Sequence, residues 1–74
     1  MDPRDYLLAY IDREGGIPQV AMKLGMAYPT LAAICNGHRG ISPKMAERMQ
    51  RADPILDRNR LVWIRATKAE KKAA

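Results

Sequence analysis

The chain has 74 residues, with 13 Lys and Arg against 8 Asp and Glu and a formal charge of +5. A hydrophobic share of 47% argues against wholesale disorder, and a single cysteine, Cys35, excludes an intramolecular disulfide. One cysteine and one histidine also exclude a zinc site with the usual ligand spacing, while the excess of cations favours a polyanionic partner, most often nucleic acid.

The sequence also points away from membranes and catalysis. No apolar run approaches the roughly 20 residues that a membrane span needs, and the first residues lack signal-peptide character. We therefore expect a cytoplasmic, nucleoid-associated protein. No set of nucleophile, base and acid and no phosphate loop can be assembled, so we expect no enzyme, cofactor or metal site. A domain this small without disulfides relies on helix packing or on a partner subunit.

The first predicted helix covers residues 3–14. Asp2 can cap it, and Pro3 suits the first helical position, where proline loses no hydrogen bond. Its apolar face recurs at helical spacing and consists of Leu7, Leu8, Tyr10 and Ile11. The pair Gly15-Gly16 ends this helix.

Two short helices are predicted on either side of Gly25. The first begins at Pro18 and has an inner face of Val20, Ala21 and Leu24. The second covers residues 28–36, and its inner face consists of Leu31, Ile34 and Cys35. Tyr28 precedes a proline and is therefore biased away from the α region, which predicts that Tyr28 caps this helix.

The last two predicted helices begin at Ser42 and at Asp53. Each of these cap residues is followed by a proline, and the helix after Ser42 turns Met45, Ala46 and Met49 inward. We assign residues 54–74 to a C-terminal helix with a frayed, basic end. By periodicity alone, the run from Leu61 to Ile64 fits a strand or a helix. The Ala- and Lys-rich residues after that run favour helix.

Ala21 and Gly25 stand four residues apart between the two short helices. Helices that cross at about 90–120° need small residues where they touch and a tight turn, which these two residues supply. With Leu31 six residues after the glycine and Ile34 three further on, the pattern resembles the helix-turn-helix signature. We therefore expect residues 1–53 to form a helix-turn-helix bundle.

A wider resemblance covers residues 16–52. The segment ICNGHRGISPKMAERM, with Asn36-Gly37-x-Arg39 and then Ser42-Pro43, resembles the Cro, phage-repressor and HigA-antitoxin group of prokaryotic helix-turn-helix domains. This resemblance implies an all-α fold, a compact bundle of about five helices, and sequence-specific operator binding as a homodimer.

The resemblance also implies a set of DNA contacts. The major groove, about 12 Å wide, admits one helix, whose N-terminal residues meet the base edges. The base-contacting positions then fall on Tyr28, Pro29, Thr30, Ala32 and Ala33. Phosphate contacts are expected from Gln19, Lys23, Asn36, His38, Arg39 and Lys44. Since no Arg, Gln or Asn stands at the base-reading positions, we expect apolar contacts and DNA shape to contribute strongly.

The run Leu61, Val62, Trp63 and Ile64 is more apolar surface than a small domain easily covers beside its own core. We hypothesise that it forms a dimer interface with Trp63 as the anchor. The alternative is packing against the first helix of the same chain. A two-fold dimer would hold its two recognition helices about 34 Å apart, which is one turn of DNA.

Together, these features predict a transcriptional repressor that binds a palindromic double-stranded DNA operator as a homodimer, on a plasmid, phage or other mobile element. A HigA-like antitoxin that binds a toxin partner and represses its own operon is the alternative. An adaptor without DNA binding and a nucleic-acid chaperone without sequence preference are further alternatives. Cys35 is expected to be a core thiol.

Overall fold

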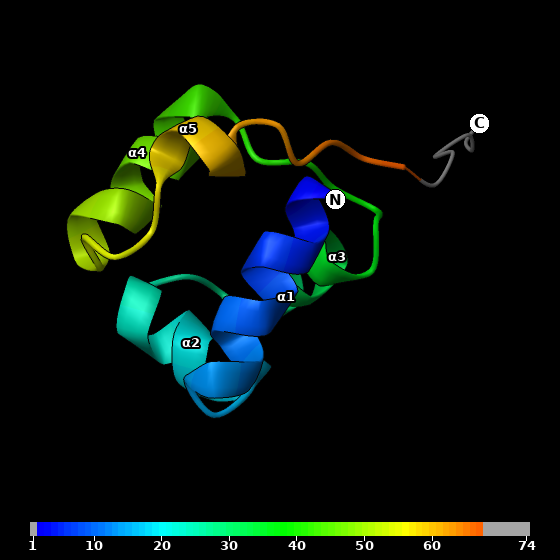
Figure 1. Cartoon of the computed structure of the whole chain (residues 1–74). Helices are drawn as coiled ribbons and strands as arrows, with labels where there is room; N and C mark the ends of the chain where they lie inside the picture. The colour runs from blue at the N-terminus through cyan, green and yellow to red at the C-terminus, as the bar shows by residue number, and fades with distance from the viewer. Residues whose placement is uncertain (1, 68–74) are drawn as a thin grey trace.

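Five helices form the part of the chain that the computed structural model describes, residues 2–67. They are α1 (Pro3–Arg13), α2 (Ile17–Leu24), α3 (Tyr28–Cys35), α4 (Pro43–Ala52) and α5 (Arg58–Leu61) (Figure 1). No strand occurs within this range. The prediction of an all-α bundle of about five helices is therefore confirmed.

Side-chain caps begin the first and fourth helices where the sequence predicts them. Asp2 accepts a hydrogen bond from the backbone amide of Arg4 at 2.9 Å, and Ser42 accepts one from that of Met45 at 3.1 Å. In both helices a proline follows the cap, at a position where no hydrogen bond of the helix is lost. Local chemistry is therefore enough to start α1 and α4.

A left-handed glycine separates α2 from α3. Gly25 has φ +68° and ψ 32°, and the amide of Met26 donates to the carbonyl of Ala21 at 2.9 Å. This arrangement ends a helix by satisfying a carbonyl that would otherwise lack a partner. It also lets the chain turn sharply enough for a second helix to begin at Tyr28.

The cap of α3 differs from the prediction. The carbonyl of Ala27 accepts the amides of Thr30 and Leu31 at 3.1 and 3.2 Å, so Ala27 holds the cap position. The prediction that Tyr28 caps the helix is wrong, because Tyr28 is the first helical residue. Pro29 is tolerated at the next position because first-turn amides have no partner inside a helix.

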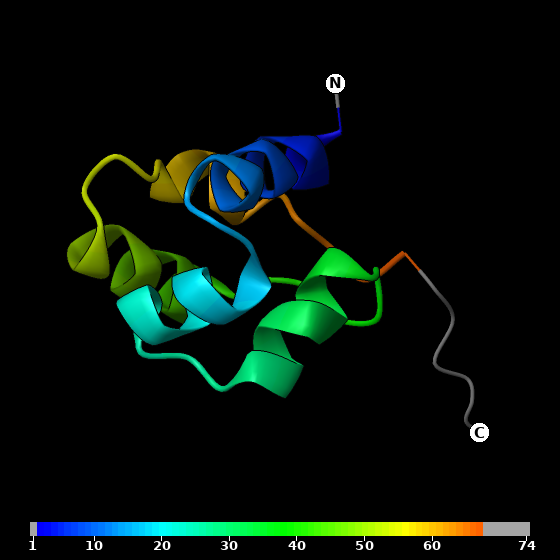
Figure 2. The same cartoon turned by 90° about the horizontal axis from the view of Figure 1, so that it is seen from below.

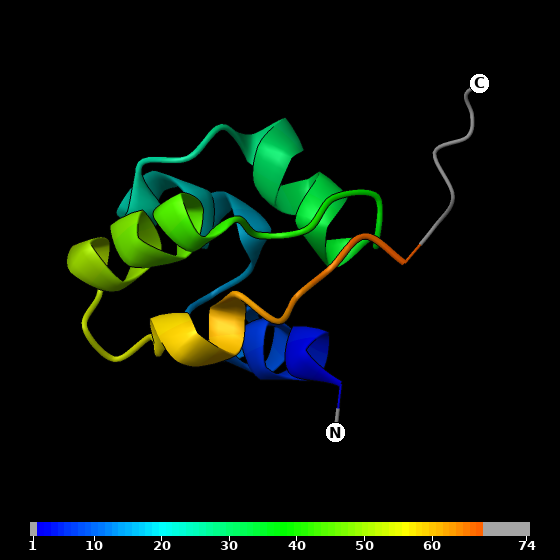
Figure 3. The same ribbon diagram turned by 90° about the horizontal axis from the view of Figure 1, so that it is seen from above.

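One core fills the space between the helices. Its fully buried large side chains come from all five helices and from the segments beside α5: Leu7, Tyr10, Val20, Leu31, Ile34, Met49, Leu56, Leu61 and Ile64. α1 and α5 lie along one edge of the bundle and α3 along the opposite edge (Figures 2 and 3). α3 packs against α1 and α2 and against no other described helix. One side of α3 is therefore turned outward.

The prediction of one C-terminal helix over residues 54–74 is wrong within the described range. α5 is a single short helix, and its cap is Asp57, which accepts the amide of Asn59 at 2.9 Å. Asp53, the predicted cap, instead lies directly after α4. Residues 62–67 are not helical. The rest of the predicted helix, residues 68–74, lies outside the described residues.

Long-range packing explains why the helix stops. The amide of Ile41 donates to the carbonyl of Ile64 at 2.9 Å, and the amide of Thr67 donates to the carbonyl of Gly37 at the same distance. Ile64 is thereby buried in the core. A continued helix would keep these backbone groups for itself and would give up both bonds. The run from Leu61 to Ile64 is consequently neither a strand nor part of a long helix.

Candidate nucleic-acid interface

The outer side of α3 is not covered by the described part of the chain. Leu31 and Ile34 are 0% exposed and anchor the inner side of the helix in the core. The residues that face away from them, which we call the outer side of α3, are Tyr28, Pro29, Ala32 and Ala33. Tyr28 is 51% exposed, and the two alanines are partly exposed. Tyr28 is the only one of the four with a long side chain.

Thr30 lies on the flank of α3 that faces α4. It lines a hollow together with the turn after α2 and with Met45, Arg48 and Met49 of α4. Its side chain is partly buried there. The structure thus places Thr30 beside Arg48, apart from the other predicted base contacts.

Most basic side chains of the described range have partners inside the molecule. Arg51 and Arg58 approach the carboxylate of Glu47 at 3.3 and 3.9 Å. Other arginines lie over aromatic rings, at 4.9–6.0 Å from the ring centre: Arg13 over Tyr10, Arg60 over Tyr6 and Arg65 over Trp63. Arg4 is buried and donates to backbone carbonyls.

Three exposed cations have no such partner among residues 2–67: Arg39, Lys44 and Arg48. Arg39 follows the C-terminal end of α3, whereas Arg48 shares a hollow with Thr30 near its N-terminal end. An eight-residue helix is about 12 Å long. Arg39 and Arg48 therefore stand near the two ends of α3, where a helix lying in a groove of DNA meets phosphates. Lys44 lines a different hollow, between α4 and α5, together with Glu47 and Arg58.

Arg48 is not among the residues that the resemblance implies. Its signal in the sequence is spacing, because residues four apart, such as Lys44 and Arg48, share one side of a helix. Arg51, three residues after Arg48, lies on that side as well, but it pairs with Glu47. The ion pair of Arg51 with Glu47 is what distinguishes the two arginines in the structure.

The connection after α3 brings three of the predicted phosphate contacts together. Asn36, His38 and Arg39 are all exposed. The amides of His38 and Arg39 both donate to the carbonyl of Ala33, at 2.9 and 3.3 Å, which folds the connection back against the end of α3. Gln19, on α2, is also exposed.

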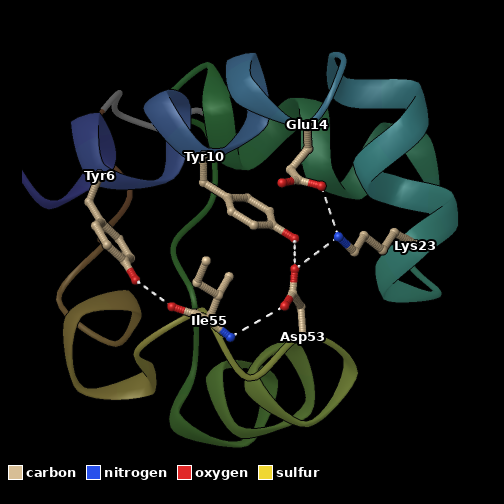
Figure 4. Close-up of polar contacts among 6 residues, drawn as sticks. All are labelled: Tyr6, Tyr10, Glu14, Lys23, Asp53 and Ile55. Carbon is tan, nitrogen blue, oxygen red and sulfur yellow. Dashed lines mark hydrogen bonds and ion pairs between the residues drawn. The ribbon is translucent and has the colours of Figure 1, made fainter.

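Lys23 is the predicted phosphate contact that the structure engages elsewhere. Its Nζ lies 2.8 Å from Oε1 of Glu14 and 3.1 Å from Oδ2 of Asp53 (Figure 4). The hydroxyl of Tyr10 donates to the same Asp53 oxygen at 2.6 Å. Hydrogen bonds to Glu14 and Asp53 raise the pKa of Lys23 above its ordinary value. The Lys23 amine is therefore already engaged by two carboxylates of its own chain.

This cluster of Tyr10, Glu14, Lys23 and Asp53 joins α1, α2 and the end of α4. Burial, followed by the hydrogen bond to Asp53, raises the pKa of Tyr10 to about 12. The hydrogen bonds from Tyr10 and Lys23 hold the pKa of Asp53 below its ordinary value. These pKa shifts keep the phenol of Tyr10 neutral, the carboxylate of Asp53 ionised and the amine of Lys23 charged, which are the forms that make the hydrogen bonds of the cluster. The cluster thus holds α2, against which α3 packs.

The predicted dimer residues divide into buried and exposed ones. Leu61 and Ile64 are 0% and 1% exposed, because they belong to the core of their own chain. The prediction that these two meet a second subunit is therefore wrong. Val62 is partly buried against the core, whereas Trp63 is 64% exposed.

The side chain of Trp63 lines one end of an apolar groove along α1. One hollow lies between Trp63 and Tyr6, and a second continues from Tyr6 to the exposed Ile55. We call these hollows together the α1 groove; its apolar and aromatic lining is Pro3, Tyr6, Ala9, Tyr10, Ile55 and Trp63, and its charged rim is Asp2, Asp5, Arg13 and Arg60. Tyr6 bonds to the carbonyl of Ile55, whereas Arg4 bonds to α3. The groove and α3 therefore lie on different flanks of α1.

Three further observations concern metal ligands, membrane-spanning helices and the thiol of Cys35 in the described residues. No group of three His, Cys, Asp or Glu side chains within residues 2–67 is arranged to hold a metal ion. In the same range, no helix has both the length and the hydropathy to cross a bilayer. Cys35 packs against the core, and its burial raises the pKa of the thiol. The chain matches no family model, no curated protein and no solved structure.

Proposed function

We propose that the protein is a sequence-specific DNA-binding repressor in which α2 and α3 act as a helix-turn-helix and the outer side of α3 enters the major groove. The observation that carries this proposal is the distribution of charge. Two of the cations without an intramolecular partner in residues 2–67, Arg39 and Arg48, stand near the two ends of α3, whose outer side is exposed. The phosphates that border a groove are the partner that this arrangement fits.

The small side chains on the outer side of α3 support the proposal. Ala32 and Ala33 allow the helix backbone to approach the bases closely. Tyr28 can hydrogen-bond a base edge, and Pro29 and the alanines can contact thymine methyl groups. Because such apolar contacts discriminate modestly, sequence-dependent groove shape supplies further specificity.

We further propose that the repressor is a homodimer joined through the α1 groove, with Trp63 as its anchor. The rim of the groove carries acidic Asp2 and Asp5 as well as basic Arg13 and Arg60. An antiparallel pairing of two copies can therefore set acid against base. A two-fold dimer with its recognition helices about 34 Å apart matches a palindromic operator. Occupying a promoter in this way represses by excluding polymerase.

The dimer is tested by sedimentation of Trp63→Ala. We expect its mass to fall from that of a dimer to that of a monomer at the same concentration, because a buried aromatic anchor is lost. Leu8→Ala is the control, since Leu8 is also exposed but does not line the α1 groove. A dimer of unchanged mass in Trp63→Ala would show that the groove is not the interface.

DNA binding is tested by selecting duplexes from a random pool and then measuring affinity for the recovered sequence. We expect a palindromic consensus. Ala33→Glu should lower affinity at least about 100-fold, or about 2.7 kcal/mol, because its carboxylate would face bases and phosphates without a partner. The matched control is Ala52→Glu at the exposed end of α4, which should leave affinity nearly unchanged. Equal affinities of the two variants, or a pool without a consensus, would contradict the proposal.

A further inference from the structure

The segment that follows α5 runs directly beside the connection between α3 and α4. We call residues 64–67 the strap. Backbone hydrogen bonds fasten it at both ends, from Ile41 to the carbonyl of Ile64 and from Thr67 to that of Gly37, each 2.9 Å long. These two bonds bracket the loop of residues 37–41, which carries Arg39.

Gly40 shows how closely the strap approaches this loop. A Cβ at residue 40 would lie 2.8 Å from the carbonyl oxygen of Ile64 and 3.0 Å from the Cα of Arg65. Both are backbone atoms, which no side-chain rotation can move away. Gly40 lacks the positive φ of Gly25. Glycine is therefore needed here for space, and the strap is what occupies that space.

Arg4 also ties the strap to α3. Its side chain is nearly buried, at 8% exposure. Nε donates to the carbonyl of Ile34 in α3 at 2.8 Å, and an outer guanidinium nitrogen donates to the carbonyl of Arg65 at 2.6 Å. The planar, forked guanidinium can hold two acceptors at fixed directions, which a lysine cannot. Arg4 thus sets the distance between α3 and the strap.

We propose that the strap holds the loop of residues 37–41 in the shape that presents Arg39 to the DNA backbone, with Arg4 and Gly40 as positioning residues. This inference rests on the proposed DNA binding. Arg39 itself is exposed. The hydrogen bond from its backbone amide to the carbonyl of Ala33 is long, at 3.3 Å, so the contacts of Arg39 itself restrain it weakly. A strap that orders the loop before binding removes that ordering cost from the binding step.

The test is Gly40→Ala, in the full chain, on a duplex recovered by selection. Affinity should fall about tenfold, and the slope of log K against log salt should become shallower by about 0.9, because one phosphate contact is lost. If the substitution only lowered the fraction of folded protein, the apparent affinity would fall but the slope of log K against log salt would stay the same. Gly16→Ala is the matched control: φ is +108° there, so alanine strains the fold, but the strap is not touched.

A double-mutant cycle identifies the residue through which Gly40 acts. Once Arg39→Ala has removed the contact, Gly40→Ala should have little further effect on affinity or slope. Thr67→Pro, which removes the amide that bonds Gly37, should reproduce a smaller loss if Gly40→Ala does not fold. Independent, additive effects, or an unchanged slope in folded variants, would overturn the strap's role and leave DNA binding standing. Absence of binding by the unaltered protein would overturn the proposed function itself.

Discussion

Replacing Gly25 tests the turn between α2 and α3. A Cβ at this position would meet no atom within 4 Å, so only the backbone conformation, φ +68°, decides the outcome. The left-handed conformation costs an L-residue about 1–2 kcal/mol, and the stiffer unfolded chain of alanine offsets about 0.4–1 kcal/mol of this. We therefore expect Gly25→Ala to lower the free energy of unfolding by about 1 kcal/mol.

D-alanine at the same position should have the opposite effect. Its mirror-image preference favours positive φ, and the empty space around the Cβ avoids a clash. A synthetic chain with D-alanine at position 25 should gain up to about 1 kcal/mol, because its unfolded state is stiffer than that of glycine. Urea denaturation followed by circular dichroism measures both changes, provided that the slopes against urea agree.

Two results would refute this reasoning. Gly25→Ala without any loss of stability would mean that the residue is not held in the left-handed conformation. A loss with D-alanine would mean that space, not conformation, restricts the site. In either case α2 and α3 would not meet as described.

Three further predictions concern the polar cluster and Arg48. The pKa of Asp53 is lowered by folding, so its stabilising effect is present above the unfolded pKa of about 3.9 and is lost as pH falls through the folded value. The free energy of unfolding of Asp53→Asn should therefore depend less on pH, on the acid side, than that of the unaltered protein. An equally steep dependence in both proteins would contradict the role of Asp53 in the cluster. Tyr10 has the opposite sign, since its pKa is raised to about 12: stability should fall as pH rises above about 10, and Tyr10→Phe should remove that fall. Arg48→Gln should make the salt slope of DNA binding shallower by about 0.9 without changing the preferred duplex, whereas an unchanged slope would place Arg48 outside the interface.

Elements governed by neighbouring residues could be predicted from the sequence. The caps of α1 and α4 join residues two or three apart, Asp2 to Arg4 and Ser42 to Met45, so the local pattern contains both partners. The end of α2 is similar, because Gly25 alone permits the left-handed turn that stops the helix.

The C-terminal segment could not be predicted in this way. Asp53 followed by proline has the same form as a helix cap, and its Oδ1 accepts the amide of Ile55 at 3.3 Å, but its Oδ2 accepts the hydroxyl of Tyr10, far away in the sequence. Ile64 is likewise held by Ile41 and by the core. Local patterns do not contain these partners, so the cap pattern at Asp53 and the helix propensity of the last residues together predict a helix that the structure does not form.

The same limit applies to the candidate site. Exposure of the outer side of α3 follows from the spacing of Leu31 and Ile34, which sequence periodicity detects. Sequence periodicity does not show whether a cation is free to bind DNA, because that depends on which carboxylates lie next to it in the folded protein. Lys23 is engaged by Glu14 and Asp53, whereas Arg48 has no partner among the described residues.

Methylation protection on the selected duplex shows whether the outer side of α3 enters the major groove, as we propose. Dimethyl sulfate reacts with guanine N7 in the major groove and with adenine N3 in the minor groove. Bound protein should protect guanine N7 in two patches about 10 base pairs apart, and Ala33→Glu should abolish the protection. Protection confined to adenine N3, or guanine N7 protection that survives Ala33→Glu in full, would contradict the account.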